Sequence, residues 1–167
     1  KYFDMSIKTA IKECVKKGRL DFALSRIFAG YVFKTEKNRA RCEQRVWKYL
    51  SKSLEKVNKQ YDVAIGYLEK NPIFFCIDKV NAKKKIGFIH NDYDKLGMDP
   101  KFDMEYFSSL NNIVTVSEEC ANVLKQRFPM FKQKVEVMYN IVSPNIIKKL
   151  AQVEVNINSN DIKLVSI

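Results

Sequence analysis

Apolar residues recur at helical spacing through the first 60 residues of the chain. Ile7, Ile11 and Cys14 lie on one face of a helix, with Asp4 as its candidate N-cap and Gly18 as its end. A second helix is expected over residues 20–33, where apolar side chains occupy much of the circumference, which indicates burial. A third is expected from about residue 35 to residue 57, with an apolar stripe formed by Val46, Trp47, Leu50, Leu54 and Val57.

From residue 61 the pattern changes to short apolar runs that alternate with helical segments. Strands are expected over residues 61–67, 86–90, 113–116, 135–139 and 162–167. Helices are expected from the cap Asn71 before Pro72, over 103–110, from the cap Ser117 to Phe128, and over 144–151. This alternation is typical of βαβ units. The sequence therefore predicts an α/β fold, a three-layer Rossmann-like parallel sheet with helices on both faces, preceded by a helical N-terminal segment.

Composition places the chain among ordinary globular proteins. It has 167 residues, of which 46% are hydrophobic and 29% charged, and no uncharged run approaches the roughly 20 residues that span a bilayer. Its four cysteines are widely separated and its single histidine adds no cluster, so no metal site is expected and the thiols suit a reducing cytosol. Because the chain starts without Met and stops inside an apolar segment, we expect both ends to be cuts within a longer protein.

The net charge of +11 is concentrated at the N-terminal end. Residues 1–60 hold 16 Lys and Arg against 6 Asp and Glu, whereas residues 61–167 hold 14 against 13. Seven cations recur every three or four residues opposite the apolar stripe of the third helix: Lys37, Arg41, Arg45, Lys48, Lys52, Lys56 and Lys59. Three interpretations are open: a solvated face, an anionic membrane surface, or nucleic-acid phosphates. Tyr49 alone borders the row as a stacking platform for bases, which favours lipid.

Candidate chemistry lies where the predicted strands end. Ligands of open parallel sheets bind beyond the carboxyl ends of the strands, which selects Tyr67, His90, Ser117 and Asn140. Either ring nitrogen of His90 can donate or accept a hydrogen bond, although a surface histidine with no role is an equal alternative. Ser117 also fits a plain helix cap, and Asn140 fits an Asx turn.

Phosphate-binding loops are absent from the sequence. None of its five glycines lie two or five residues apart, which excludes both the G-x-G-x-x-G fingerprint and the P-loop. A complete dinucleotide-binding domain is therefore disfavoured, and no cofactor is expected. A cofactor-binding Rossmann enzyme with its glycine-rich turn upstream of this sequence remains an alternative.

About 100 of the 167 residues carry a resemblance to a known family. The order of segments resembles the acceptor-side, N-terminal domain of the group 1 (family 4) glycosyltransferases of GT-B fold, in which strands end in a histidine motif, a V-S-E motif and an asparagine motif. The matching segments here are His90-Asn91-Asp92, Val116-Ser117-Glu118, Tyr139-Asn140-Ile141-Val142-Ser143 and the terminal "KLVSI". Ile141 stands where the family usually has glycine.

This resemblance implies three parts: a basic helical region (1–60), the Rossmann-like part (61–158) and the start of a second domain (159–167). The parent enzyme would transfer a sugar from a nucleotide-sugar, bound by that second domain, to a surface-glycan or lipid-linked acceptor without a metal ion. It would work in the cytoplasm, at the inner face of the cell membrane, and the chain alone would be inactive. The implied catalytic residue is His90, and the implied substrate-binding residues are Asn91, Asp92, Ser117, Glu118 and Asn140.

A non-enzymatic α/β module is the alternative of another class. It would bind nucleic acid through the seven cations and ignore nucleotide-sugars.

Overall fold

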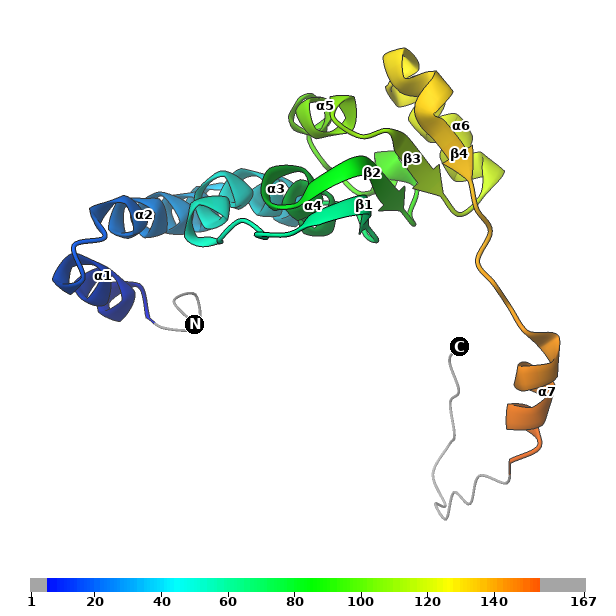
Figure 1. The fold of residues 1–167 in the computed structure, drawn as a ribbon, viewed down its shortest axis with the longest axis horizontal. Helices are drawn as coiled ribbons and strands as arrows, with labels where there is room; N and C mark the ends of the chain where they lie inside the picture. The colour runs from blue at the N-terminus through cyan, green and yellow to red at the C-terminus, as the bar shows by residue number, and fades with distance from the viewer. Residues whose placement is uncertain (1–5, 154–167) are drawn as a thin grey trace.

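The computed structural model describes residues 6–153 (Figure 1). Its N-terminal part consists of three helices, α1 (Ile7–Lys16), α2 (Leu20–Thr35) and α3 (Arg39–Leu50). The hydroxyl of Ser6 caps α1 by accepting a hydrogen bond from the backbone N–H of Thr9 at 3.3 Å, whereas the candidate cap Asp4 lies outside the described residues. Gly18 has φ +68° and ends this helix as predicted, because glycine adopts that conformation without steric cost.

The third helix is shorter than predicted and ends at Leu50. The chain then tightens into a 3₁₀ turn, η1 (Ser51–Ser53), in which the Ser53 hydroxyl donates to the carbonyl of Leu50 at 2.7 Å. Local side-chain bonds of this kind compete with the next backbone bond of a helix. At the other end, the Asn38 side chain caps α3 by accepting from the N–H of Arg41 at 3.0 Å.

The prediction that the second helix is well buried is wrong. Small residues of α2, such as Ala23 and Ala29, are buried, and Ala29 packs with Cys42 and Val46 of α3. Six large apolar side chains of α2 are 48–66% exposed: Leu20, Leu24, Ile27, Phe28, Tyr31 and Phe33. The helix contacts α1, α3 and η1, and the first five of these side chains lie on the side that faces away from the buried Ser25 and Ala29. Phe33 lies on another side, near the end of the helix.

The sheet has four strands, all parallel, in the order β1-β2-β3-β4. They are β1 (Gln60–Gly66), β2 (Asn81–Ile89), β3 (Asn112–Thr115) and β4 (Val135–Val137). The α/β class, the parallel sheet and these four strands are confirmed. β2 starts earlier than predicted because it pairs with β1 along the whole length of β1, from the Gln60–Asn81 pair to the Gly66–Gly87 pair. The fifth predicted strand, 162–167, lies outside the described residues.

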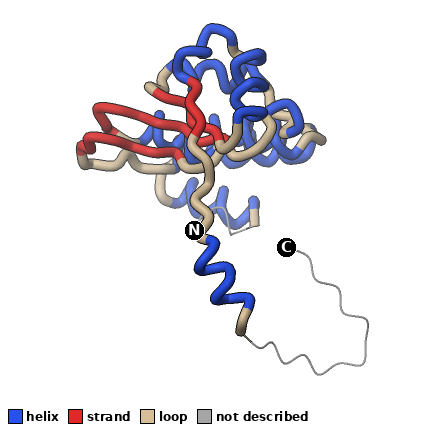
Figure 2. Tube along the Cα trace, turned by 90° about the vertical axis from the view of Figure 1, so that its right-hand side faces the viewer, coloured by secondary structure: helices blue, strands red, loops and turns tan. Residues whose placement is uncertain are grey.

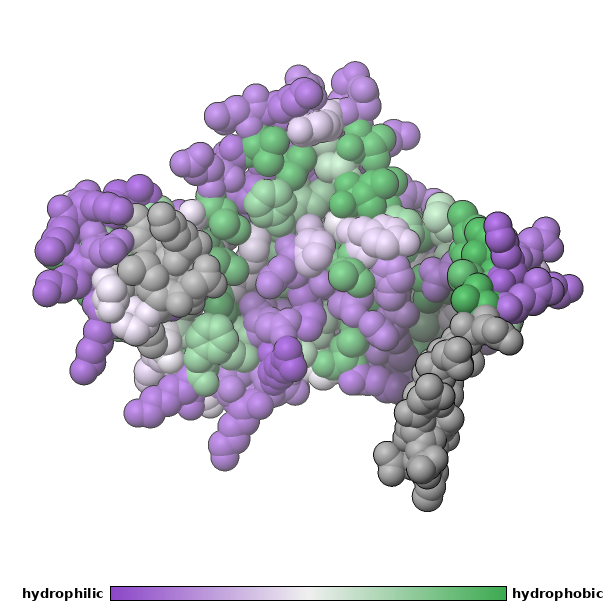
Figure 3. Space-filling model, turned by 90° about the horizontal axis from the view of Figure 1, so that it is seen from below, coloured by the Kyte–Doolittle hydropathy of each residue, from purple (hydrophilic) through white to green (hydrophobic). Residues whose placement is uncertain are grey.

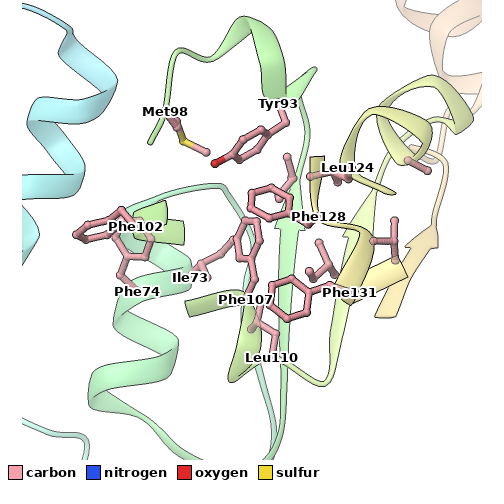
Figure 4. Close-up of a cluster of buried hydrophobic side chains, with 14 of the residues drawn as sticks. Ile73, Phe74, Tyr93, Met98, Phe102, Phe107, Leu110, Leu124, Phe128 and Phe131 are labelled. Atoms are coloured by element: carbon pink, nitrogen blue, oxygen red, sulfur yellow. The ribbon is translucent and has the colours of Figure 1, made fainter. Parts of the chain in front are cut away.

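Three helices connect the strands and pack into one apolar core with the sheet (Figure 4). They are α4 (Asn71–Lys79), α5 (Pro100–Ser108) and α6 (Glu118–Arg127), accompanied by the 3₁₀ turns η2 (Tyr93–Lys95) and η3 (Pro129–Lys134). Aromatic rings meet edge to face at its centre, where Phe128 lies 5.0 Å from Tyr93 and 5.1 Å from Phe107, between ring centroids.

The second helical layer that the sequence predicted is not formed by the described residues. Gly66 and Gly87 face Ile73 of α4 so closely that an added Cβ would lie 2.7 and 3.0 Å from its atoms. The residues that alternate with these glycines, such as Val63 and Ile65, are 46% and 54% exposed on the opposite face. A strand order of 1-2-3-4 with crossovers of one hand places every connecting helix on the same side. Apolar side chains accordingly reach the surface over the middle of the molecule (Figure 3).

A last helix, α7 (Pro144–Ala151), has the predicted bounds. The Ser143 hydroxyl caps it by accepting from the N–H of Ile146 at 3.4 Å. The helix stands apart from the rest of the described chain (Figures 1 and 2), and none of its residues is buried.

Candidate functional site

An aromatic group lies at the carboxyl ends of β1 and β2, where the sequence predicted a binding crevice. The Tyr67 ring meets the His90 imidazole edge to face, with 4.9 Å between centroids, and lies 4.9 Å from Phe88. Phe88 and His90 stack at 5.8 Å. These rings belong to the face of the sheet that no described helix covers, because residues 86, 88 and 90 alternate with the helix-facing Gly87 and Ile89. Within the group Phe88 is itself buried, whereas Tyr67 is 60% exposed. The structure therefore brings Tyr67 and His90 together.

The imidazole of His90 has unused hydrogen-bonding capacity. Its Nδ1 atom is buried and has no hydrogen-bond partner among the described residues. Buried polar atoms without a partner are rare in folded proteins, because each one loses its bond to water. A ligand hydroxyl would restore that bond only after the groups that cover Nδ1 move aside, because the atom is closed to solvent.

Glu69 is part of this site, and the sequence analysis missed it. Its Oε1 accepts a hydrogen bond from the side-chain amide of Asn91 at 2.7 Å, and its Oε2 accepts one from the backbone N–H of His90 at 3.3 Å. This carboxylate thus fixes the loop that follows β2 and, with it, the orientation of His90. Its position three residues beyond the end of β1 is the signal that could have selected it.

The next residue, Lys70, has a conformation that side chains rarely adopt. Its φ is +67° and its ψ −122°, while its ammonium group forms a 2.6 Å ion pair with Glu43 of α3. Lys70 rather than the predicted Asn71 is the N-cap residue, and Asn71 opens α4 with its buried Oδ1 unpaired among the described atoms. Backbone strain of this kind concentrates at functional sites.

Ser117 and Glu118 lie at the neighbouring strand end. The pairing of Ile89 with Thr115 places His90 level with Val116, one residue before Ser117. The Ser117 hydroxyl caps α6 by accepting from the N–H of Cys120 at 3.3 Å, so its predicted role as a cap is confirmed. Glu118 is exposed in the first turn of that helix.

Asp92 is engaged within its own turn. It accepts from the N–H of Asp94 at 3.1 Å and forms an ion pair with Lys95 at 3.2 Å. The hydrogen bond from Lys95, followed by those from the backbone, lowers the pKa of Asp92 below its ordinary value. Asp94 is paired with Arg127 at 2.7 Å, so these neighbouring carboxylates serve local ion pairs.

Asn140 is not brought into contact with the aromatic group. It is exposed in the segment between β4 and α7, three residues beyond the end of β4. The next residue, Ile141, is fully exposed.

A hollow of about 610 Å³ lies at the opposite edge of the sheet, near the amino ends of β1 and β2. Four lysines line it: Lys56, Lys59, Lys79 and Lys85. Lys85 is occupied, because its ammonium donates to the carbonyl of Ile77 at 2.8 Å near the end of α4. This lysine therefore satisfies a carbonyl near the C-terminal end of α4.

All seven cations of the predicted basic row are exposed, but they do not form one helical row. Arg41, Arg45 and Lys48 lie on α3, whereas the others precede the helix or follow its end at Leu50. Arg45 forms an ion pair with Glu36 at 2.7 Å. The ring of Tyr49 stacks on Phe28 at 5.6 Å and 18°, so one of its faces is already covered.

Neither a membrane span nor a metal cluster is found in residues 6–153. No helix there is both long and apolar enough to cross a bilayer, and no three His, Cys, Asp or Glu side chains are grouped to hold a metal ion. Cys14, Cys42, Cys76 and Cys120 are all free thiols.

Comparison with known proteins identified no relative of the chain. No protein-family model, no curated protein and no solved structure matches the chain.

Proposed function

We propose that this chain forms the acceptor-side part of a glycosyltransferase, with the sugar bound at the carboxyl ends of β1 and β2. The observation that carries the proposal is the buried, unpaired Nδ1 of His90 beside the exposed ring of Tyr67. A sugar ring has an apolar face, which packs on an aromatic ring, and a rim of hydroxyls, which need hydrogen-bond partners. Tyr67 offers the first kind of contact, and His90 would offer the second once its Nδ1 is opened to the ligand.

In the proposed reaction, the bond between the sugar C1 and the phosphate oxygen of the donor breaks. A new bond forms between C1 and a hydroxyl oxygen of the acceptor, the hydroxyl proton is released, and the nucleoside diphosphate leaves with the electron pair of the broken bond. His90 would hydrogen-bond a hydroxyl of the reacting sugar and hold its ring in line for this displacement. The donor nucleotide would be bound by a second domain that is not included in this sequence.

Positioning of His90 is assigned to Glu69 and Asn91. Glu69 accepts hydrogen bonds from both the His90 backbone and the Asn91 amide, so the three residues form one unit. Ser117 and Glu118 would line the neighbouring part of the crevice, with the N-terminus of α6 facing polar groups of the substrate. Asn140 would join the site only through a change in the segment that carries it.

The nucleic-acid alternative receives less support. Stacking of bases on Tyr49 would compete with the Phe28 ring that already covers one of its faces. Retention of an oligonucleotide with a steep salt dependence, and indifference to sugars, would favour this alternative.

Two substitutions in the intact enzyme test the proposal. We expect His90→Ala to lower kcat by about 100-fold, a typical loss for one transition-state hydrogen bond and its orientation, and Tyr67→Ala to raise KM for the acceptor. Tyr61→Ala is the matched control, because Tyr61 is also an exposed tyrosine but lies at the amino end of β1, away from the crevice.

Thermal unfolding of each variant separates loss of function from loss of structure. An unchanged kcat for His90→Ala, in a protein that is otherwise folded, would refute the proposed role. The same would follow if Tyr61→Ala and Tyr67→Ala had equal effects on KM.

A further inference from the structure

The outer side of α2 carries a continuous apolar row. Leu20, Leu24, Ile27, Phe28 and Tyr31 recur at helical spacing and are 48–66% exposed. The opposite side of the helix is the one that packs, since Ser25 and Ala29 are buried there. A stripe of this size is unusual for a helix in contact with water alone.

This apolar row adjoins the cations of α3. Phe28 stacks on Tyr49 of α3, which joins the two helices at the surface. Arg45 of α3 and Lys52 of η1 lie about one helical turn before and after Tyr49, and both are exposed, with Arg45 also paired with Glu36. Arg41 and Lys48 extend the same exposed side of α3. An apolar row and a cationic band therefore lie side by side.

Charge decides what can cover this surface. Residues 6–59 hold 15 Lys and Arg against 5 Asp and Glu, so a second copy of the chain would bring like charges together. A soluble polyanion would satisfy the cations and leave the apolar row in water. A bilayer with anionic headgroups satisfies both, because its phosphates meet the cations while apolar side chains enter the acyl boundary.

We propose that α2 and α3 together bind an anionic lipid surface, with the apolar row of α2 inserted and the α3 cations at the headgroups. α2 lies on the membrane in this arrangement, consistent with the absence of a spanning helix in the part of the chain described. Tyr31 occupies the headgroup level, where tyrosine and tryptophan side chains are enriched. The binding is independent of the crevice around His90 and goes beyond the proposed glycosyl transfer.

Vesicle sedimentation with the full chain tests the proposal. We expect retention on vesicles of phosphatidylcholine with phosphatidylglycerol in equal parts, and little on phosphatidylcholine alone, because each cation near the surface contributes about fivefold to partitioning. High salt weakens the binding. Replacing Leu24 and Ile27 by Ser lowers partitioning by about tenfold or more, since two inserted side chains lose their burial.

Phe33→Ser is the matched control for the apolar row. Phe33 is 61% exposed on the same helix, but it lies about 200° around the helix from Tyr31 and outside the row. Lys132→Glu, at an exposed position of η3, is the control for Arg41→Glu, which we expect to weaken binding. All these positions are exposed, and circular dichroism checks that each variant is folded.

Three results would overturn the proposal. One is equal retention on neutral and anionic vesicles, or none on either. Another is an equal loss for Phe33→Ser and for the Leu24 and Ile27 variant. The third is unchanged binding of that variant while Arg41→Glu releases the chain, because the contact would then be electrostatic alone. The surface would be assigned to nucleic acid if an oligonucleotide displaced the chain from vesicles and the Leu24 and Ile27 variant bound that oligonucleotide as tightly as the wild type does.

Discussion

At the scale of single residues, the site depends on two groups that are held in energetically unfavourable states. His90 keeps a buried ring nitrogen unpaired, and Lys70 keeps a backbone conformation that suits glycine. The two are linked through Glu69, which precedes Lys70 and bonds the His90 backbone. The sequence predicted His90 from its place at a strand end. It could not predict the strain at Lys70, because nothing in a lysine marks a positive φ.

The strain at Lys70 gives a testable order of stabilities. Lys70→Gly and Lys70→Ala both lose the ion pair with Glu43, but only glycine adopts φ +67° without strain. We expect the glycine variant to be more stable than the alanine variant by about 1 kcal/mol or more. Urea unfolding followed by the fluorescence of Trp47, the single tryptophan, measures the difference.

Lys125 provides the comparison for Lys70. It lies inside α6, where helix propensity alone favours alanine over glycine by about 1 kcal/mol. The account fails at this point if alanine is also the better replacement at Lys70.

At the scale of elements, polar side chains fix how α3, η2 and α5 meet. The amide of Gln44 on α3 donates to the carbonyl of Asp99 at 3.2 Å and accepts from its N–H at 2.8 Å. Within the core, the Tyr93 hydroxyl of η2 donates to Asp103 of α5 at 2.6 Å. The sequence predicted the apolar stripe that buries Trp47, but these cross-links join residues far apart in the chain and leave no local pattern.

Asp103 makes this junction sensitive to pH. Burial raises the pKa of Asp103 from 3.8 to about 6, against the opposing effect of the Tyr93 hydrogen bond. Because the pKa is higher in the folded state than in the unfolded state, the folded state binds the proton more tightly. Stability contributed by the neutral carboxyl is therefore present below about pH 4 and is lost as pH rises to about 6, by up to about 3 kcal/mol.

Urea unfolding of the wild type and of Asp103→Asn between pH 4 and pH 7 checks this dependence. The stability of the wild type relative to the variant should fall across this range, because the amide does not ionise. A difference that stays constant, or that rises with pH, would show that Asp103 does not carry the effect.

At the scale of the whole molecule, the alternation of apolar runs and helical segments was enough to predict the parallel α/β sheet. It was not enough to predict the layers. The large apolar residues of β1 share one face of the strand, where Val63 and Ile65 remain exposed, whereas the face packed on α4 carries the small residues Ala64 and Gly66. The burial of α2 was mispredicted for the same reason, because an apolar surface indicates a partner without identifying it. A membrane for α2 is the partner proposed above.

The central claim is that the carboxyl ends of β1 and β2 bind a sugar through His90 and Tyr67. Since the chain has a single histidine, the imidazole carbon–proton signal in an NMR spectrum reports on this site alone. Titration of the full chain with a panel of methyl hexosides and methyl N-acetylhexosaminides is the most direct test. We predict that at least one glycoside shifts this signal saturably in the wild type and does so much less in Tyr67→Ala, whereas Tyr61→Ala behaves as the wild type. A signal that no glycoside moves, or that moves equally in both variants, would contradict the account.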